Sequence, residues 1–171
     1  MEIIRPKENF FIEYLNACKE SYENKITEWM PFEPNHFDVW KEHILEAYDN
    51  YEKGIDIPDG FPRTYTYWCV EGDTFIGEVQ IRPFLNENEA QNWGHIAYAI
   101  RYSQWNKGYG TRLLKAALDK LREFGVSNIY IACHKTNAVS IKVIEKNGGS
   151  FINSIIDEEG IEQNKYYLNL K

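Results

Sequence analysis

The segment from Gly94 to Gly110, G-H-I-A-Y-A-I-R-Y-S-Q-W-N-K-G-Y-G, restricts the fold more than any other part of the sequence. It reads as an apolar strand, a short turn and a glycine-punctuated loop, and an amphipathic helix over 111–124 follows at once. A strand that delivers a glycine-containing loop to a helix N-terminus gathers backbone N–H groups where the helix dipole favours negative charge. The segment therefore predicts a phosphate-binding site and a ligand that carries a pyrophosphate.

The order of the predicted elements is that of an α+β protein. Helical spacing of apolar residues predicts helices over 8–23, 37–53, 111–124 and 137–147. Strand patterns cover 2–5, 65–70, 74–84, 93–101, 128–133, 150–156 and 161–170. Strands joined by short turns should pair antiparallel, whereas the strand–helix–strand order across 93–133 predicts one parallel pair. We therefore expect a mixed sheet in one domain over residues 1–171.

Composition argues against several functional classes. The net charge of −7 is unlike that of a general nucleic-acid binder, which needs a basic surface. The amino terminus, M-E-I-I-R-P-K-E, lacks the apolar core of a secretory signal, and no uncharged run approaches the roughly 20 residues of a membrane helix. We therefore expect a cytoplasmic protein with no membrane or nucleic-acid partner. Cys18, Cys69 and Cys133 form no C-x-x-C pair and the histidines show no ligand spacing, so no metal site is expected.

The glycine loop differs from two common phosphate loops. A P-loop would need G-x-x-x-x-G-K-[ST], but Lys107 precedes Gly108, and a dinucleotide fingerprint would need a third glycine where Leu113 stands. The segment W-N-K-G-Y-G instead resembles the [R/Q]-x-x-G-x-[G/A] signature of the GNAT superfamily of acyl-CoA-dependent N-acetyltransferases. It departs from that signature at Trp105, where Arg or Gln is usual. A plain glycine-rich turn with an exposed lysine is the alternative for the loop alone.

A second match to that family follows the next predicted strand. The family places an Asn at the start of the following helix, where it makes a second cofactor contact, and the sequence H-K-T-N-A-V-S-I-K-V-I-E-K-N-G-G puts Asn137 and Ser140 there. The alternative is that Asn137 only caps the helix. This string is similar to sequence found in a group of bacterial predicted acetyltransferases of unassigned substrate. The strings L-N, which follows Ile81-Arg82, and G-H-I-A-Y-A-I-R add to the similarity.

The resemblance implies a fold and a cofactor. The fold is a mostly antiparallel sheet of about seven strands flanked by about four helices, with the fourth and fifth strands splayed apart. The cofactor is acetyl-CoA, acting as a co-substrate whose arm lies in the splay. The expected cofactor contacts are Ala99, Ile100, Arg101, Tyr102, Trp105, Asn106, Lys107, Gly108, Tyr109, Gly110, Thr111, Asn137 and Ser140.

The resemblance also implies direct attack of a primary amine on the acetyl thioester, so no enzyme nucleophile is needed. The amine must lose a proton, and His95 and Glu78 are the candidate bases. Strand alternation puts His95 on one face with Ala97 and Ala99. The alternatives are that His95 is a hydrogen-bonded structural histidine and that Glu78 is a solvated strand residue.

A second proton transfer concerns the departing CoA thiolate, which can take up a proton as it leaves. Many family members use a Tyr seven residues after the Asn, but here that position is Ile144, which cannot donate a proton. Tyr98, Tyr102 and Tyr109 are near in sequence, and the sequence does not select among them. Another possibility is that the thiolate leaves unassisted, since the pKa of a thiol is near about 8.5.

The acceptor is expected to be a small-molecule or peptide amine. In the family its specificity comes from segments that correspond here to 29–35, which contains Glu33, and to 157–165, which is acidic. Acidic segments favour a cationic acceptor, although an acidic turn is usually only a solvated surface. A non-catalytic CoA-binding module and an interaction domain without a cofactor are the competing functions. The family often dimerises, and the sequence leaves open whether this chain forms a homodimer.

Overall fold

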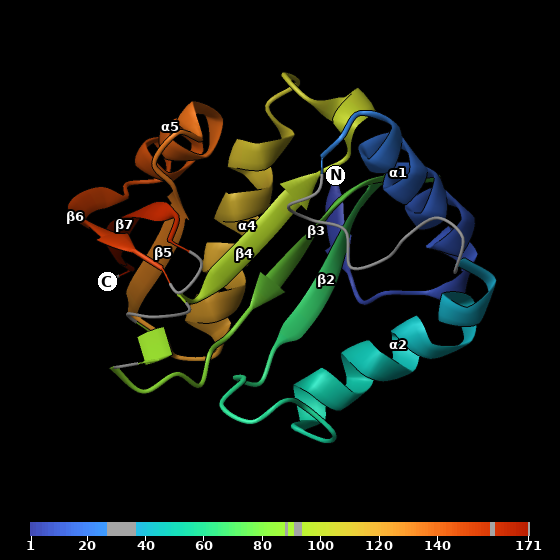
Figure 1. Cartoon of the computed structure of the whole chain (residues 1–171), viewed down its shortest axis with the longest axis horizontal. Helices are drawn as coiled ribbons and strands as arrows, with labels where there is room; N and C mark the ends of the chain where they lie inside the picture. The colour runs from blue at the N-terminus through green and yellow to red at the C-terminus, as the bar shows by residue number, and fades with distance from the viewer. Residues whose placement is uncertain (27–36, 88, 91–93, 158–159, 171) are drawn as a thin grey trace.

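The computed structural model describes residues 1–26, 37–87, 89–90, 94–157 and 160–170. Its described strands form two sheets, one of four strands in the order β1-β2-β3-β4 and one of three strands in the order β5-β7-β6 (Figure 1). The described helices are α1 (Phe11–Glu23), α2 (Phe37–Lys53), α4 (Tyr109–Glu123) and α5 (Ala138–Lys146), with short 3-10 turns η1 (Glu8–Phe10) and η3 (Tyr102–Gln104). The strands are β1 (Glu2–Ile4), β2 (Tyr65–Glu71), β3 (Thr74–Ile81), β4 (Ile96–Ile100), β5 (Asn128–His134), β6 (Ser150–Ile156) and β7 (Glu162–Asn169). The predicted α+β class is confirmed.

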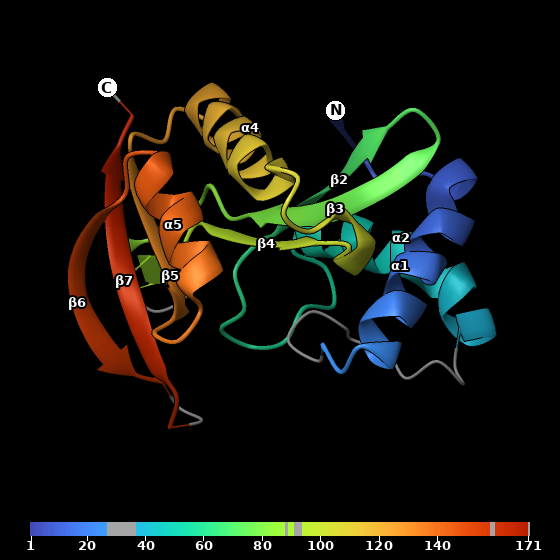
Figure 2. The ribbon, with the colours of Figure 1, turned by 90° about the horizontal axis from the view of Figure 1, so that it is seen from above.

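Helices cover both faces of the four-stranded sheet. Leu113, Leu114, Ala117, Leu118 and Leu121 of α4 are buried against the sheet, as their helical spacing predicts. The opposite face packs on α1 and α2, where the ring of Tyr14 stacks on Trp68 with centroids 4.8 Å apart. Figure 2 shows α4 on one side of the sheet and the two N-terminal helices on the other. No described helix is both long enough and apolar enough to cross a bilayer.

The predicted parallel pair does not form a ladder between the described strands. The His95 N–H donates to Tyr130 O at 2.8 Å, just before β4 begins. The Tyr130 N–H, which lies on the N-terminal side of that bond, donates to the His95 ring atom Nδ1 at 3.1 Å. The carbonyl that a parallel ladder would use for its next bond, His95 O, accepts the Arg82 N–H at 2.9 Å instead. From this junction β4 and β5 diverge (Figure 1), and the described strand pairs are antiparallel. Where the splay begins, the His95 carbonyl therefore bonds to Arg82, just after β3, and not to β5.

Candidate active site

A cavity of about 820 Å³ runs along the open edge of β4. Strand alternation directs Tyr98 and Ile100 toward α4, and Ala97 and Ala99 toward α1 and α2. The cavity therefore reaches both faces of the sheet around the β4 edge. It is lined by Ser21, Ile26, Glu78, Gln80, Ala97, Tyr98, Ala99, Ile100, Gln104, Trp105, Asn106, Gly108, Tyr109, Gly110, Thr111, Asn137, Val139, Ser140, Lys142, Val143 and Lys146.

The pairing register determines which backbone groups of β4 face this cavity. The Arg82 N–H donates to His95 O at 2.9 Å, and the Arg101 N–H donates to Ile76 O at 2.8 Å. In an antiparallel pair the hydrogen-bonding residues alternate, so the odd-numbered residues of β4 bond to β3. The N–H and C=O groups of Tyr98 therefore point toward the splay. The Ile100 carbonyl on the same edge accepts a hydrogen bond from Trp105 Nε1 at 2.7 Å.

The glycine loop forms the end of the cavity at the start of α4. Asn106 and Gly108 have positive φ angles of 61° and 77°, and Gly108 immediately precedes α4. A Cβ atom built on Gly108 would meet nothing within 4 Å, so the approach to the helix N-terminus is open. The N–H groups of Tyr109, Gly110 and Thr111 belong to the first turn and have no partner within the helix. These positions are the ones that the sequence predicts.

Three expected cofactor contacts lie outside the cavity lining. The Nε of Arg101 donates to Glu20 Oε1 at 2.8 Å and its NH1 donates to Glu13 Oε2 at 2.6 Å, so this cation joins β4 to α1. The hydrogen bond from Arg101 lowers the pKa of Glu13. Lys107 Nζ donates to the Ser103 carbonyl at 2.9 Å. Tyr102 is exposed and its ring lies 5.0 Å from that of Trp105.

The start of α5 borders the same cavity. The Asn137 side chain accepts a hydrogen bond from the Ser140 N–H at 3.0 Å, so it caps the helix, and both residues line the cavity. Tyr98 OH donates to Ser140 Oγ at 3.4 Å, and burial raises the pKa of Tyr98 to about 12. Ile144 is completely buried and offers no proton. Tyr98 thus supplies a hydroxyl on this side of the cavity.

Glu78 is a buried carboxyl group in the cavity wall. It is 4% exposed, and its Oε2 accepts hydrogen bonds from Tyr48 OH at 2.7 Å and Trp68 Nε1 at 3.1 Å. Its Oε1 accepts from Gln80 Nε2 at 3.2 Å. Burial raises the pKa of Glu78 in spite of these three donors. The carboxyl is therefore fixed in position and holds its proton to higher pH than an exposed glutamate.

His95 lies on the predicted strand face but outside the cavity lining. It is 4% exposed, and burial lowers its pKa, which favours the neutral imidazole. Because Nδ1 accepts the Tyr130 N–H, the proton of the neutral ring sits on Nε2. This tautomer has no free lone pair with which to accept a proton. The geometry therefore argues against His95 as a base and favours the alternative of a hydrogen-bonded structural histidine.

Sequence reasoning missed part of this site. Gln80 could have been found, because strand alternation places it on the face of Glu78. Tyr48 gave no such signal, since only the packing of α2 on β2 and β3 brings its hydroxyl to the carboxylate. The segment 29–35 lies outside the described residues, as do residues 158 and 159 of the acidic hairpin. Within the described part of the chain, no group of three or more His, Cys, Asp or Glu residues is arranged to hold a metal ion.

The fold and the cavity define a protein of the acyl-CoA-binding α+β class, and comparison with known proteins agrees. A family model described as Acetyltransferase (GNAT) domain matches residues 13–150. The chain therefore belongs to the GNAT acetyltransferase family. A curated relative, the chloroplastic GCN5-related N-acetyltransferase 6 of Arabidopsis thaliana, is 28% identical over 85 residues. That match covers 47% of this chain and only 30% of the length of the relative.

Two solved structures share the fold at low sequence identity. The ribosomal-protein-S5-alanine acetyltransferase of Vibrio fischeri has a TM-score of 0.74 and 15% identity, and the match covers 99% of this chain and 93% of that one. RimL, a ribosomal L7/L12 alpha-N-protein acetyltransferase solved in complex with coenzyme A, has a TM-score of 0.72 and 13% identity. That match covers 98% of this chain and 92% of RimL. The likeness confirms the fold expected from the sequence.

Proposed function

We propose that this protein is an acetyl-CoA-dependent N-acetyltransferase that acts on a primary amine of a small molecule or peptide. One observation carries the proposal: a single cavity joins the N–H-lined loop at the start of α4 to the buried carboxyl of Glu78. The first feature suits the phosphates of a coenzyme, and the second suits proton removal from an amine. Bound acetyl-CoA would supply an acetyl group already activated as a thioester.

The residues of the cavity suit this cofactor. The unpartnered N–H groups of Tyr109, Gly110 and Thr111 bind the pyrophosphate, and the open space at Gly108 lets it approach the backbone. The outward-facing backbone groups of Tyr98 pair with the amides of the pantetheine arm. The same edge offers an N–H group to the negative charge that develops on the thioester oxygen during attack.

Glu78 is the base in this proposal. Its raised pKa brings it closer to the working pH of a general base, and the bonds from Tyr48, Trp68 and Gln80 fix its orientation. It takes a proton from the ammonium form of the acceptor, directly or through one water molecule. His95 has no part in this step, because its Nδ1 already accepts the Tyr130 N–H.

Tyr98 takes the place of the missing Tyr at position 144 as a donor toward the leaving sulfur. Of the three tyrosines near in sequence, Tyr102 is outside the cavity and Tyr109 OH is bound to Glu71. Tyr98 OH lines the cavity, and its pKa of about 12 keeps it protonated at neutral pH. It therefore stabilises the thiolate by donating a hydrogen bond rather than by complete proton transfer.

The test is thermal unfolding with and without acetyl-CoA, followed by measurement of CoA release with a panel of primary amines. A ligand at a hundredfold excess over its Kd stabilises the native state by about 2.7 kcal/mol. We expect a clear upward shift that Gly108→Trp abolishes, and CoA release with at least one amine. A shift without release would identify a non-catalytic CoA-binding module, and no shift would identify an interaction domain. Cytoplasmic location stays a prediction from the sequence, and the sequence leaves the oligomeric state open.

A further inference from the structure

Arg82 is a buried cation without a carboxylate partner among the described residues. It is 6% exposed, and its Nε atom has no hydrogen-bond partner in the described part of the chain. Among the described residues, its NH1 and NH2 groups reach only the Gly94 carbonyl and Gln80 Oε1, each at 3.5 Å. Burial lowers the pKa of Arg82 to about 10, so the guanidinium is still charged at neutral pH. Because an unpaired buried charge is costly, this arrangement points to an anion that arrives with a ligand.

His95 lies beside Arg82 and supplies a second donor. The Arg82 N–H bond to His95 O continues the register in which Gln80 is opposite Ala97, so the Arg82 and His95 side chains project from the same face. With Nδ1 accepting the Tyr130 N–H, the proton of the neutral imidazole is on Nε2. No described residue accepts a hydrogen bond from that Nε2. Arg82 Nε and His95 Nε2 are thus neighbouring donors, and neither has an acceptor among the described residues.

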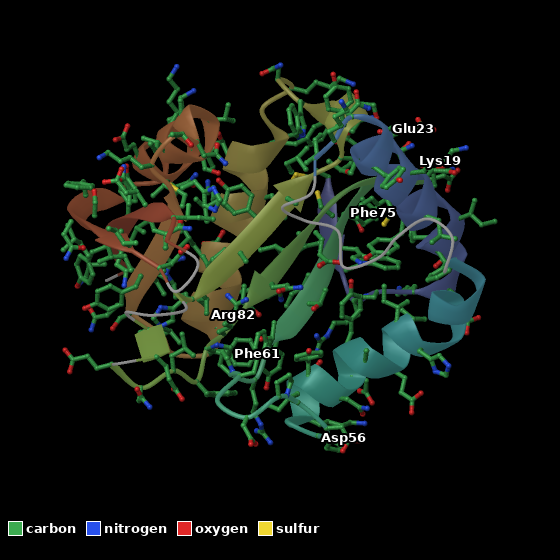
Figure 3. All side chains as sticks on the ribbon, viewed as in Figure 1. Lys19, Glu23, Asp56, Phe61, Phe75 and Arg82 are labelled. Carbon is green, nitrogen blue, oxygen red and sulfur yellow. The ribbon has the colours of Figure 1, made fainter. Side chains whose placement is uncertain are left out.

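Arg82 also continues a row of polar side chains that begins at the proposed base. Gln80 donates to Glu78 Oε1 and accepts from Arg82 NH2, so it links the two charged residues. Four residues of extended strand separate the Cα atoms of Glu78 and Arg82 by about 13 Å. Figure 3 shows Arg82 at the opposite end of β3 from Phe75, away from the start of α4. The cavity follows this row from Glu78 to Gln80, where the opposite residues are the small Ala99 and Ala97. Arg82 and His95 lie outside its lining, and Arg82 NH2 is 3.5 Å from the Gln80 oxygen.

We infer that Arg82 and His95 bind a carboxylate group of the amine acceptor. The inference rests on the proposed function and narrows it: the acceptor is a primary amine with a carboxylate several bonds from the nitrogen. The amine lies at Glu78 and the carboxylate at the Arg82 end of the row. One cation beside a neutral imidazole matches a single negative charge, so a carboxylate suits this pair better than a phosphate dianion.

The first experiment detects anion binding without turnover. The Nε–Hε NMR signal of Arg82, assigned with Arg82→Lys, is followed while wild-type protein is titrated with 6-aminohexanoate, hexanoate, hexylamine or inorganic phosphate at constant ionic strength. We expect 6-aminohexanoate and hexanoate to change the chemical shift of this signal until it saturates, and hexylamine to leave the shift unchanged. A change in chemical shift with hexylamine alone, with inorganic phosphate alone, or with none of the compounds would overturn the inference.

The second experiment compares kcat/KM for 6-aminohexanoate and hexylamine by CoA release. Wild type should prefer the carboxylate by at least 10-fold, and Arg82→Gln should lose that preference because its kcat/KM falls much more with 6-aminohexanoate than with hexylamine. Arg63→Gln, whose exposed guanidinium donates to the Lys53 carbonyl at 2.7 Å, is the matched control and should keep the preference. An equal loss of kcat/KM with both amines would mean that Arg82 has only a structural role. If no amine is acetylated and acetyl-CoA does not bind, the proposed function fails, and the NMR titration still decides the anion site.

Discussion

Among single residues, Glu78 offers the most direct test of the proposed chemistry. Glu78→Gln keeps the shape of the side chain and an oxygen that can accept from Tyr48 and Trp68, but it cannot take a proton. General-base catalysis contributes about 100-fold to 10,000-fold, so we expect kcat to fall at least 100-fold. CoA release under saturating acetyl-CoA measures the effect. A variant with more than a tenth of wild-type kcat would exclude Glu78 as the base.

The pH dependence of Glu78 can be tested with the same variant. Burial raises the pKa of Glu78 above its ordinary 4.5, so the kcat/KM of wild type should fall as the pH drops through that raised value. The folded protein then holds this proton more tightly than the unfolded chain does. The stability that the protonated carboxyl contributes is complete below pH 4.5 and is lost as the pH rises through the raised pKa. Thermal unfolding of Glu78→Gln should lack this decline, and an identical decline in both proteins would contradict the assignment.

Tyr98 is the second residue at which the chemistry can be tested. Tyr98→Phe removes only the hydroxyl that donates to Ser140 Oγ, so acetyl-CoA binding should change less than threefold. Loss of one hydrogen bond to a developing charge, worth about 1.5–3 kcal/mol, predicts a 10-fold to 100-fold lower kcat. Tyr167→Phe, which removes an exposed hydroxyl bound to Asn128, is the matched control. Equal kcat values for the two variants would remove Tyr98 from the mechanism.

The sequence predicted residues whose roles are local better than residues whose roles depend on distant contacts. The Gly108 turn and the Asn137 cap depend on neighbours in the chain, and both were predicted. Arg101 was expected at the cofactor, but its partners Glu13 and Glu20 are 88 and 81 residues away on α1. His95 is likewise held by the Tyr130 N–H of another strand, a contact that argues against its use as a base. No local pattern could reveal either contact.

At the scale of elements, the contact between β3 and β4 is the one on which the cavity depends. A Cβ atom on Gly77 would lie 2.3 Å from the Ala99 carbonyl oxygen, a backbone atom that cannot rotate away. Gly77→Ala should therefore push β4 from β3, cost about 1–3 kcal/mol of unfolding free energy, and weaken acetyl-CoA binding along the displaced strand. Chemical denaturation and a binding titration measure the two effects.

Gly60→Ala is the control for this steric effect. Its φ is +77°, and a Cβ there would meet nothing within 4 Å, so it introduces backbone strain without a clash. We expect a smaller loss of stability, about 1 kcal/mol, and unchanged acetyl-CoA binding. If Gly77→Ala binds acetyl-CoA as tightly as Gly60→Ala does, the close approach of β3 and β4 is not what shapes the cavity.

The class and order of the elements could be predicted because periodicity and turn residues are recorded in the sequence. The divergence of β4 from β5 could be expected only from the family resemblance. In the structure, the His95 carbonyl, which would have continued the parallel ladder, accepts the Arg82 N–H instead. Which of two neighbouring strands a single carbonyl bonds to leaves no periodic signal in the sequence.

At the scale of the whole molecule, two connections hold the splayed sheets and the helices around the cavity. The larger core joins α4 to both sheets, since Leu114 and Leu118 pack in one cluster with Ile131 and Leu168. The other connection is ionic: Arg101, just after β4, is bonded to Glu13 and Glu20 of α1. The cavity wall near Ser21 therefore depends on a pair of charges as well as on apolar packing.

This ionic connection predicts a pH-dependent effect of Arg101→Gln on global stability. At pH 7 the substitution leaves two partly buried carboxylates without their cation and should cost about 2–3 kcal/mol of unfolding free energy. The pKa of Glu13 is lowered by its hydrogen bond from Arg101, so this stabilisation is present above pH 4.5 and is lost as the pH falls through the lowered value. The gap between variant and wild type should therefore narrow at pH 3. Urea denaturation at both pH values measures it, with Arg122→Gln, which breaks an exposed pair with Asp119, as a control that should change little. A gap of the same size at both pH values would mean that Arg101 acts through packing and not through its charge.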